Sequence, residues 1–365
     1  MEIPDILPVR NSKMECLFRS RAPAVKLLLH CLFLSCVALS FSFTSFGQGL
    51  YQAEKDLSQA EDIPYQRYFT RDSFSRRITF YVTKPSANPE AKLPLIVSIL
   101  GSGGDSNFLR RDERILDGHR VLRNVFSGRA YILIVEKPGV SFGEHPNLGV
   151  GFSEGTPEEF RRENTLDRWS EAVSAALKAA RTLSFIDTSR TLALGHSEGG
   201  LIASRVAAMN PFVTHVASLA GGGPTILFDL IELTREGYIG ADTGGTPDER
   251  VQKLLSDWAE VMRDPDNPSR YLHGQTYRWW ASEAASSCME ELLKTKARVY
   301  IAQGTEDHKV VPITFDILLA HLLAHGRDVT ADRVIGAAHS LMFPNEPDRD
   351  GQLEVFERIR TWFIG

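Results

Sequence analysis

The chain has 365 residues, 43% of them hydrophobic, and a formal net charge of −5 at pH 7. This composition is ordinary for a globular protein, and the length allows one large α/β domain or two smaller ones. The acidic balance, with no basic stripe along the sequence, lacks the electrostatic pattern that binds nucleic acid, so we expect no nucleic-acid partner.

The N-terminus has the pattern of a secretory signal peptide over residues 1–47. Basic residues precede an apolar run from Leu27 to about Phe46, and small residues then lead to Gln48, which suits a cleavage site. An uncleaved membrane anchor is the alternative, because the run approaches the length that spans a bilayer. We predict cleavage, and therefore an exported protein, periplasmic or extracellular, without stable membrane association.

Strands and helices alternate after a polar segment at residues 48–65, which reads as a linker or a docked N-terminal arm. The predicted strands are apolar runs rich in β-branched residues: 78–82, 95–100, 131–135, 191–194, 213–220, 297–302 and 329–335. This alternation predicts an α/β domain over residues 66–365, built on a mostly parallel sheet with helices on both faces.

Apolar residues at helical spacing predict helices over about 169–180, after residue 197, and at the C-terminus over about Gly351 to Phe363. For the last helix we expect a buried side made of Leu353, Phe356, Ile359, Trp362 and Phe363.

One segment, about 226–292, interrupts the alternation and is helical or irregular. A long insertion after a strand, at the carboxyl edge of a sheet, is typical of a lid over a binding site. Its aromatic residues, Trp279 and Trp280 among them, either line a substrate pocket or form the core of the lid.

The segment Gly195–Gly200 reads Gly-His-Ser-Glu-Gly-Gly and lies between a predicted strand and a predicted helix. A Gly-x-Ser-x-Gly pattern in that context is a nucleophile elbow, a tight turn that presents the serine hydroxyl above the sheet. The flanking residues must be small because strand and helix nearly touch there. Ser197 is therefore the predicted nucleophile, and His196 is predicted to be structural or adjacent to the substrate.

A serine hydroxyl needs a base to take its proton and an acid to hold that base. The expected chain order on this fold is serine, acid, histidine. Asp307 follows the strand 297–302, and His339 follows the last strand in a loop of small residues. We predict these two residues as acid and base, with Glu306 as a rival acid and His308 as a bystander.

Acyl transfer also needs donors for the developing oxyanion. One is the backbone N–H after the nucleophile, that of Glu198, whose side chain we expect to act in positioning. The second is expected from the glycine-rich loop after strand 95–100, where Ser102 is the first candidate and Gly103 the second. A tight turn without chemistry is the alternative for this loop.

Other reactive side chains carry no comparable motif. Three of the four cysteines lie in the leader, so Cys288 is alone after cleavage and reads as a buried packing residue. His321 and His325 have zinc-helix spacing but no evident third ligand, and a solvated helix face is the simpler interpretation. We therefore expect no metal and no cofactor.

These motifs together resemble the α/β-hydrolase superfamily, and in particular bacterial secreted serine esterases and hydrolases related to prolyl oligopeptidase and dienelactone hydrolase. The resemblance covers about residues 66–365 and implies a Ser197–Asp307–His339 triad, with Ser102 and Glu198 as oxyanion donors. The chain departs from the pattern after strand 131–135, where relatives often have Asp-x-Arg-Gly and this chain has Glu-Lys-Pro-Gly. Leu100 also stands where many have histidine.

The sequence favours a carboxylic-ester hydrolase whose partner is a small-molecule ester. A serine peptidase acting on short peptides is the alternative; it would usually recognise a charged peptide terminus, and no dedicated carboxylate pair or arginine stands out. A non-catalytic binding protein on the same scaffold is disfavoured, because all three triad candidates occur in the expected order.

Overall fold

The structure, a computed structural model, describes residues 51–85, 91–146 and 152–365. The predicted signal peptide, residues 1–47, lies outside the described residues. In the part that is described, no helix is both long enough and apolar enough to cross a membrane.

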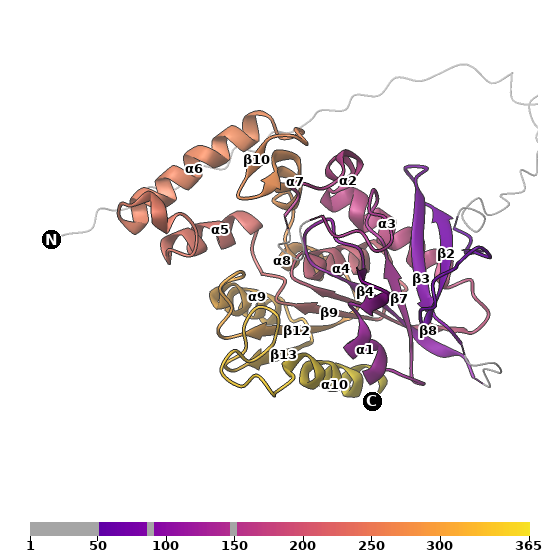
Figure 1. The fold of residues 1–365 in the computed structure, drawn as a ribbon. Helices are drawn as coiled ribbons and strands as arrows, with labels where there is room; N and C mark the ends of the chain where they lie inside the picture. Colours follow the sequence, from indigo (N-terminus) through magenta and orange to yellow (C-terminus); the bar gives the residue numbers. More distant parts are fainter. Residues whose placement is uncertain (1–50, 86–90, 147–151) are drawn as a thin grey trace, which may run out of the picture. The chain divides into compact units, whose positions relative to one another are not determined.

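Within the described ranges, nine strands form one sheet in the order β1-β2-β3-β7-β4-β8-β9-β12-β13 (Figure 1). Their bounds are β1 (Glu54–Lys55), β2 (Tyr65–Arg71), β3 (Arg77–Thr83), β4 (Leu93–Ile99), β7 (Tyr131–Val135), β8 (Ile186–His196), β9 (His215–Leu219), β12 (Arg298–Gly304) and β13 (Val329–Val334). The six strands β7, β4, β8, β9, β12 and β13 are parallel to one another. The strands β1, β2 and β3 extend the sheet beyond β7 in antiparallel fashion. The predicted α/β fold with a mostly parallel sheet is confirmed.

One prediction near the N-terminus needs correction. No strand was expected before residue 78, whereas Tyr65–Arg71 forms β2. Its sequence, Tyr-Gln-Arg-Tyr-Phe-Thr-Arg, mixes polar and apolar residues because the strand lies near the edge of the sheet and is only half buried. The arm before it contributes β1, which pairs with β2.

Helices cover both faces of the sheet. The helices outside the insertion are α1 (Arg120–Val125), α2 (Glu158–Glu163), α3 (Leu166–Ala180), α4 (Glu198–Met209), α9 (Pro312–Ala324) and α10 (Gly351–Ile364). Figure 1 shows α3 and α4 on one side of the sheet and α1 and α10 on the other. A short hairpin, β5 (Phe108–Arg111) with β6 (Arg114–Asp117), precedes α1.

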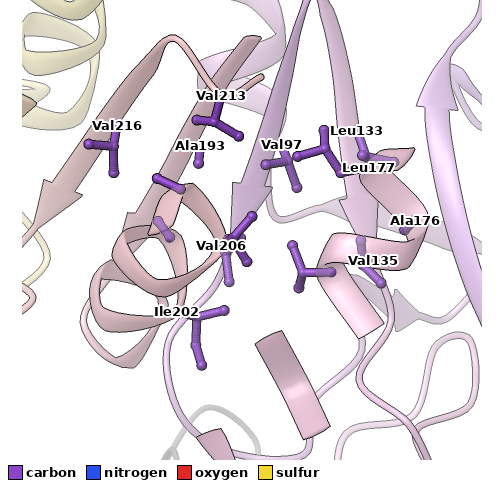
Figure 2. Packing of buried hydrophobic residues seen from close by; sticks show 14 of the residues in the cluster. Val97, Leu133, Val135, Ala176, Leu177, Ala193, Ile202, Val206, Val213 and Val216 are labelled. Atoms are coloured by element: carbon purple, nitrogen blue, oxygen red, sulfur yellow. The ribbon is translucent and has the colours of Figure 1, made fainter. Parts of the chain in front are cut away.

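Strand alternation divides the core between the two faces. On β4, Val97 packs with α3 and α4, while its neighbour Ile96 packs in the cluster of α1 and α10. Figure 2 shows Val97 and Leu133 of the sheet facing Leu177 of α3 and Val206 of α4. Because both faces of the central strands are buried, their carboxyl ends are fixed in position from both sides.

The buried side of α10 agrees with the prediction at Ile359 and Phe363 and differs from it at Leu353. Gly351, Val355, Ile359 and Phe363, each four residues apart, are buried, whereas Leu353 is 39% exposed. Phe356 and Trp362 are half-buried. The helix also buries Gly351, where a Cβ would collide with the Leu341 carbonyl.

The segment 226–292 folds as several helices, of which α6 has 17 residues, and a small hairpin. It contains α5 (Ile226–Arg235), the 3-10 helix η1 (Ala241–Thr243), α6 (Pro247–Arg263), β10 (Tyr271–Leu272), β11 (Gln275–Thr276), α7 (Tyr277–Glu283) and the start of α8 (Cys288–Lys294). A cluster of its own apolar side chains, including Leu230, Leu254 and Trp280, holds it together. It follows β9, so it leaves the sheet at the edge where the parallel strands end (Figure 1).

Candidate active site

Ser197 lies at the junction of β8 and α4 in a backbone conformation that a side chain rarely adopts. Its φ is 58° and its ψ is −128°, and its N–H donates to the Leu219 carbonyl over 2.8 Å. Such a conformation costs on the order of 1–3 kcal/mol and persists only where surrounding structure enforces it. Here the hydrogen bond to β9 and the start of α4 hold Ser197 in this conformation.

Glycine is required at the positions around Ser197 because other parts of the chain pass too close for a side chain. A Cβ at Gly195 would collide with the Gly199 carbonyl, and a Cβ at Gly199 would collide with the Ile99 carbonyl on β4. A Cβ at Gly200 would lie 2.5 Å from Ser218 Oγ. The turn therefore forms only with small residues at these positions, as the elbow pattern predicts.

Asp307 follows the carboxyl end of β12 and is 1% exposed. Its Oδ2 accepts from His339 Nδ1 over 2.8 Å and from Gln303 Nε2 over 2.6 Å. Its Oδ1 accepts from the N–H groups of Lys309 (2.8 Å) and Val310 (3.0 Å). With two bonds on each oxygen, the carboxylate is fixed in orientation. The rival Glu306 is exposed, and its N–H donates to the Ala337 carbonyl.

The Asp307 contact also sets the tautomer of His339. A carboxylate accepts hydrogen bonds, so His339 Nδ1 carries the proton and Nε2 is left as the basic nitrogen. The imidazole is only partly buried, with 17% of the side chain exposed. This is the arrangement that a general base for serine needs.

His196 connects the His339 loop to the elbow. Its Nε2 donates to the His339 carbonyl over 2.7 Å, and the two rings lie 4.8 Å apart. Burial, followed by the nearby His339, lowers the pKa of His196 to about 4, so its ring is neutral at pH 7. Among the residues that the structure describes, no hydrogen bond joins Ser197 Oγ to His339. In unliganded sites such bonds are often long and form fully only with substrate.

The glycine-rich loop after β4 lies directly against Ser197. A Cβ at Gly101 would be 3.1 Å from Ser197 Cβ and 3.6 Å from its Oγ. Glu198 is the first residue of α4, so its N–H has no partner within the helix. The structure thus brings the loop of Ser102 and the helix start at Glu198, the two predicted oxyanion donors, next to Ser197. Their donor roles remain predictions.

A buried ion pair lies beneath this loop. Lys137 Nζ donates to Glu198 Oε2 (2.7 Å), to the Gly101 carbonyl (2.9 Å) and to the Gly103 carbonyl (3.1 Å). The exposed fractions of the Lys137 and Glu198 side chains are 7% and 3%. The Glu198 carboxylate is thus held in a buried ion pair, and the positioning role expected for it stays a prediction. Gly103 contributes a carbonyl to this ion pair, and its φ of 98° favours glycine.

Lys137 contacts the site, although its sequence position did not lead us to predict it there. It stands in the Glu-Lys-Pro-Gly segment that departs from the pattern of the relatives. The sequence could have indicated it, because Lys137 is a basic residue two positions after the buried strand β7, at the sheet edge where the triad candidates also lie.

The predicted substrate-contacting tryptophans are both buried. Trp279 is 4% and Trp280 is 5% exposed, and their rings meet edge to face at 4.7 Å within the cluster of the insertion. Trp279 Nε1 donates to Glu198 Oε1 over 2.7 Å, and Trp280 Nε1 donates to the Leu272 carbonyl over 2.6 Å. The structure therefore places them in the core of the insertion, with Trp279 also touching the elbow.

A second carboxyl, that of Glu283 on α7, lies fully buried in the same region. Burial, reinforced by the nearby Glu198 carboxylate, holds the pKa of Glu283 well above its usual range.

The remaining reactive side chains lie apart from this chemistry. Cys288 is 1% exposed and burial raises its pKa to about 12, so it is a thiol at neutral pH. His308 stacks on Tyr238 with ring centroids 4.5 Å apart. The rings of His321 and His325 lie 4.3 Å apart. Across the described ranges, no group of three or more His, Cys, Asp or Glu residues could hold a metal ion.

Comparison by sequence gives no relative. A scan against protein-family models found no match. A search of curated proteins also found no match.

Comparison by structure finds similar folds at low sequence identity. Est1E from Butyrivibrio proteoclasticus with ferulic acid bound is 19% identical, with a TM-score of 0.51 over 79% of this chain and 96% of that chain. The acylaminoacyl peptidase of Pyrococcus horikoshii is 15% identical, with a TM-score of 0.54 over 82% of this chain. A puromycin-hydrolyzing peptidase of Mycobacterium tuberculosis is 17% identical, with a TM-score of 0.50 over 85% of this chain.

The matched region spans 41% and 40% of the chains of the two peptidases. The described part of this chain therefore has the α/β-hydrolase fold.

Proposed function

We propose that this protein is a serine hydrolase that cleaves carboxylic esters through an acyl-enzyme intermediate. The observation that carries the proposal is the 2.8 Å hydrogen bond between His339 Nδ1 and the buried Asp307 carboxylate, in a loop attached to the strained serine turn at Ser197. This combination prepares a base, an acid and a nucleophile at one edge of the sheet.

The proposed reaction has two halves. His339 Nε2 takes the proton from Ser197 Oγ as Oγ attacks the ester carbonyl carbon, and the carbonyl oxygen becomes an oxyanion. The backbone N–H groups of Glu198 and Ser102 receive that oxyanion. As the tetrahedral intermediate collapses, the C–O bond to the alcohol breaks and His339 returns the proton to the leaving oxygen. Water, deprotonated by His339, then attacks the acyl carbon, the bond from that carbon to Ser197 Oγ breaks, and His339 returns the proton to Oγ as the acid leaves.

The ester substrate is favoured over a peptide because the sequence offers no dedicated group for a peptide terminus. Two of the proteins with a similar fold are named as peptidases, and a third was solved with ferulic acid bound. These names support hydrolysis as the proposed reaction. We propose a small-molecule ester as the substrate, with no cofactor.

A substrate panel tests this proposal. Short-chain p-nitrophenyl esters are compared with aminoacyl and dipeptidyl p-nitroanilides, for the wild type and for Ser197→Ala. We expect ester hydrolysis that Ser197→Ala abolishes. Faster turnover of the anilides would make the protein a peptidase, and hydrolysis that persists without Ser197 would refute the nucleophile assignment.

We also propose that residues 1–47 direct export, on the strength of their basic, apolar and small-residue order. N-terminal sequencing of the protein made in bacterial cells should find a chain that starts close to Gln48 outside the cytoplasm. An intact N-terminus on a cytoplasmic protein would contradict export.

A further inference from the structure

Lys137 uses all of its hydrogen-bonding capacity beneath the glycine-rich loop. An ammonium has three N–H donors, and here they go to Glu198 Oε2, the Gly101 carbonyl and the Gly103 carbonyl. The side chain is 7% exposed, so little water competes for these donors. The ammonium is thus bound to the elbow on one side and to the loop on the other.

The hydrogen bond from Lys137 to the Gly101 carbonyl also orients the N–H of Ser102. The carbonyl of Gly101 and the N–H of Ser102 belong to one planar trans peptide, so they point in opposite directions. When Lys137 holds the Gly101 carbonyl at 2.9 Å, the Ser102 N–H must point away from Lys137. Glycine at positions 101 and 103 has no intrinsic preference strong enough to fix this plane, because glycine tolerates many φ and ψ values.

Glu198 links the second donor to the same contact. Its carboxylate binds Lys137, while its backbone N–H begins α4 beside Ser197. Its other carboxylate oxygen accepts from Trp279 Nε1 over 2.7 Å, so the insertion also helps to hold it.

A buried ion pair is a poor source of stability, because desolvation of both charges offsets their attraction. The Lys137–Glu198 pair is therefore better explained by orientation than by folding. We infer that Lys137 is a positioning residue that fixes the oxyanion-hole geometry of this hydrolase by orienting the Ser102 peptide and anchoring Glu198. The inference rests on the proposed function.

The test removes the pair without leaving a lone buried charge. The double variant Lys137→Met/Glu198→Gln deletes both charges, and the glutamine can still accept from Trp279 Nε1. Lys137→Arg keeps a cation with several donors and serves as the conservative variant. Lys294→Met is the matched control, because Lys294 pairs with the buried Glu291 at 3.1 Å but makes no contact in this network.

Three measurements separate positioning from a purely structural role. Active sites are titrated with a fluorophosphonate, kcat and KM for p-nitrophenyl butyrate are expressed per titrated site, and Ki is measured for a trifluoromethyl ketone, which forms a tetrahedral oxyanion adduct on serine. Loss of one oxyanion donor costs about 10²–10³ in kcat, and misorientation should cost somewhat less.

For the double variant we expect kcat to fall about 30-fold to 100-fold per titrated site, with KM changed less than about threefold. The affinity for the ketone should fall in parallel, Lys137→Arg should recover part of both losses, and Lys294→Met should match the wild type. If kcat per titrated site and Ki stay within about twofold of wild type, the pair is structural and the inference is wrong. If the wild type itself neither reacts with the fluorophosphonate nor hydrolyses esters, the proposed function fails and this inference falls with it.

Discussion

At the scale of single residues, the two candidates for the acid differ in burial and in hydrogen bonding. Asp307 and Glu306 are adjacent acids, and the sequence left both open. The structure buries Asp307 with four hydrogen bonds, one of them from His339, and leaves Glu306 exposed. The contact with the imidazole therefore favours Asp307 over Glu306 as the proposed acid.

Asp307→Asn should lower kcat for p-nitrophenyl esters by about 10³–10⁴ with little change in KM. An asparagine can present its NH2 group to His339 Nδ1, which favours the tautomer whose Nε2 is already protonated. Glu306→Gln is the matched control and should stay within about twofold of wild type. A larger loss in Glu306→Gln than in Asp307→Asn would reverse the assignment of the acid.

Individual elements act as a scaffold for this chemistry. The strained serine stands where β8 turns into α4, and the turn closes because glycines let α4 approach β8 and β4. The insertion reaches the same place through Trp279 on α7. Two predictions address these contacts.

Gly199→Ala should destabilise the fold by at least about 3 kcal/mol, because its Cβ would collide with the Ile99 carbonyl and α4 would have to move. Gly240→Ala is a useful comparison. Gly240 is in the ordinary left-handed region, with a φ of 70° and a ψ of 14°, and a Cβ there would meet only Thr243 Oγ1 at 3.8 Å, so the variant isolates the backbone cost alone, about 1 kcal/mol. Denaturant unfolding measures both. Equal losses in the two variants would mean that the elbow is not closely packed.

Trp279→Phe and Trp280→Phe form a matched pair, since each removes one indole N–H and keeps an aromatic ring in the cluster of the insertion. Trp279→Phe leaves Glu198 Oε1 without its donor, so we expect kcat/KM to fall several-fold. Trp280→Phe loses a bond to the Leu272 carbonyl inside the insertion and should keep its activity. Similar losses of stability, about 1–2 kcal/mol each, should accompany both changes. Activity that is equal in the two variants would argue against a link between the insertion and the elbow.

On the scale of the whole molecule, the sequence was most informative where one pattern dominates. The apolar run of β8, the glycines of the turn and the amphipathic start of α4 together predicted the elbow. The chain order of serine, acid and histidine predicted residues that the fold then brings to one edge of the sheet. Long-range contacts were harder to foresee.

The unpredicted features depend on tertiary packing. β2 is a half-buried strand that its polar residues make hard to recognise in the sequence. On α10, Gly351 is buried against the Leu341 carbonyl, whereas the larger Leu353 is exposed. Lys137 acquires its role from residues 36 and 61 positions away in the chain, through Gly101 and Glu198. Local periodicity contains no information on such contacts.

The pH dependence of stability is a property of the whole fold, and Asp229 on α5 should contribute to it. Burial, followed by the nearby Asp307 charge, raises the pKa of Asp229 from 3.8 to about 8. Between these values the folded protein keeps a proton that the unfolded chain releases, so this residue makes stability fall as pH rises from about 4 to 8.

Asp229→Asn should remove that loss. We expect the variant to exceed the wild type in free energy of unfolding by on the order of 3 kcal/mol at pH 9, and to match it near pH 4. Urea unfolding across this pH range measures the difference, with Asp328→Asn at an exposed position as the control. Parallel stability curves for Asp229→Asn and wild type would show that Asp229 does not titrate as its burial implies.

The most direct test of the central claim is covalent labelling of the intact protein with a fluorophosphonate, followed by mass spectrometry of its peptides. We predict a single adduct on the peptide that contains Ser197, absent from Ser197→Ala and slowed in Asp307→Asn. No adduct on the folded wild-type protein, or an adduct that survives Ser197→Ala, would contradict the assignment of Ser197 as the nucleophile.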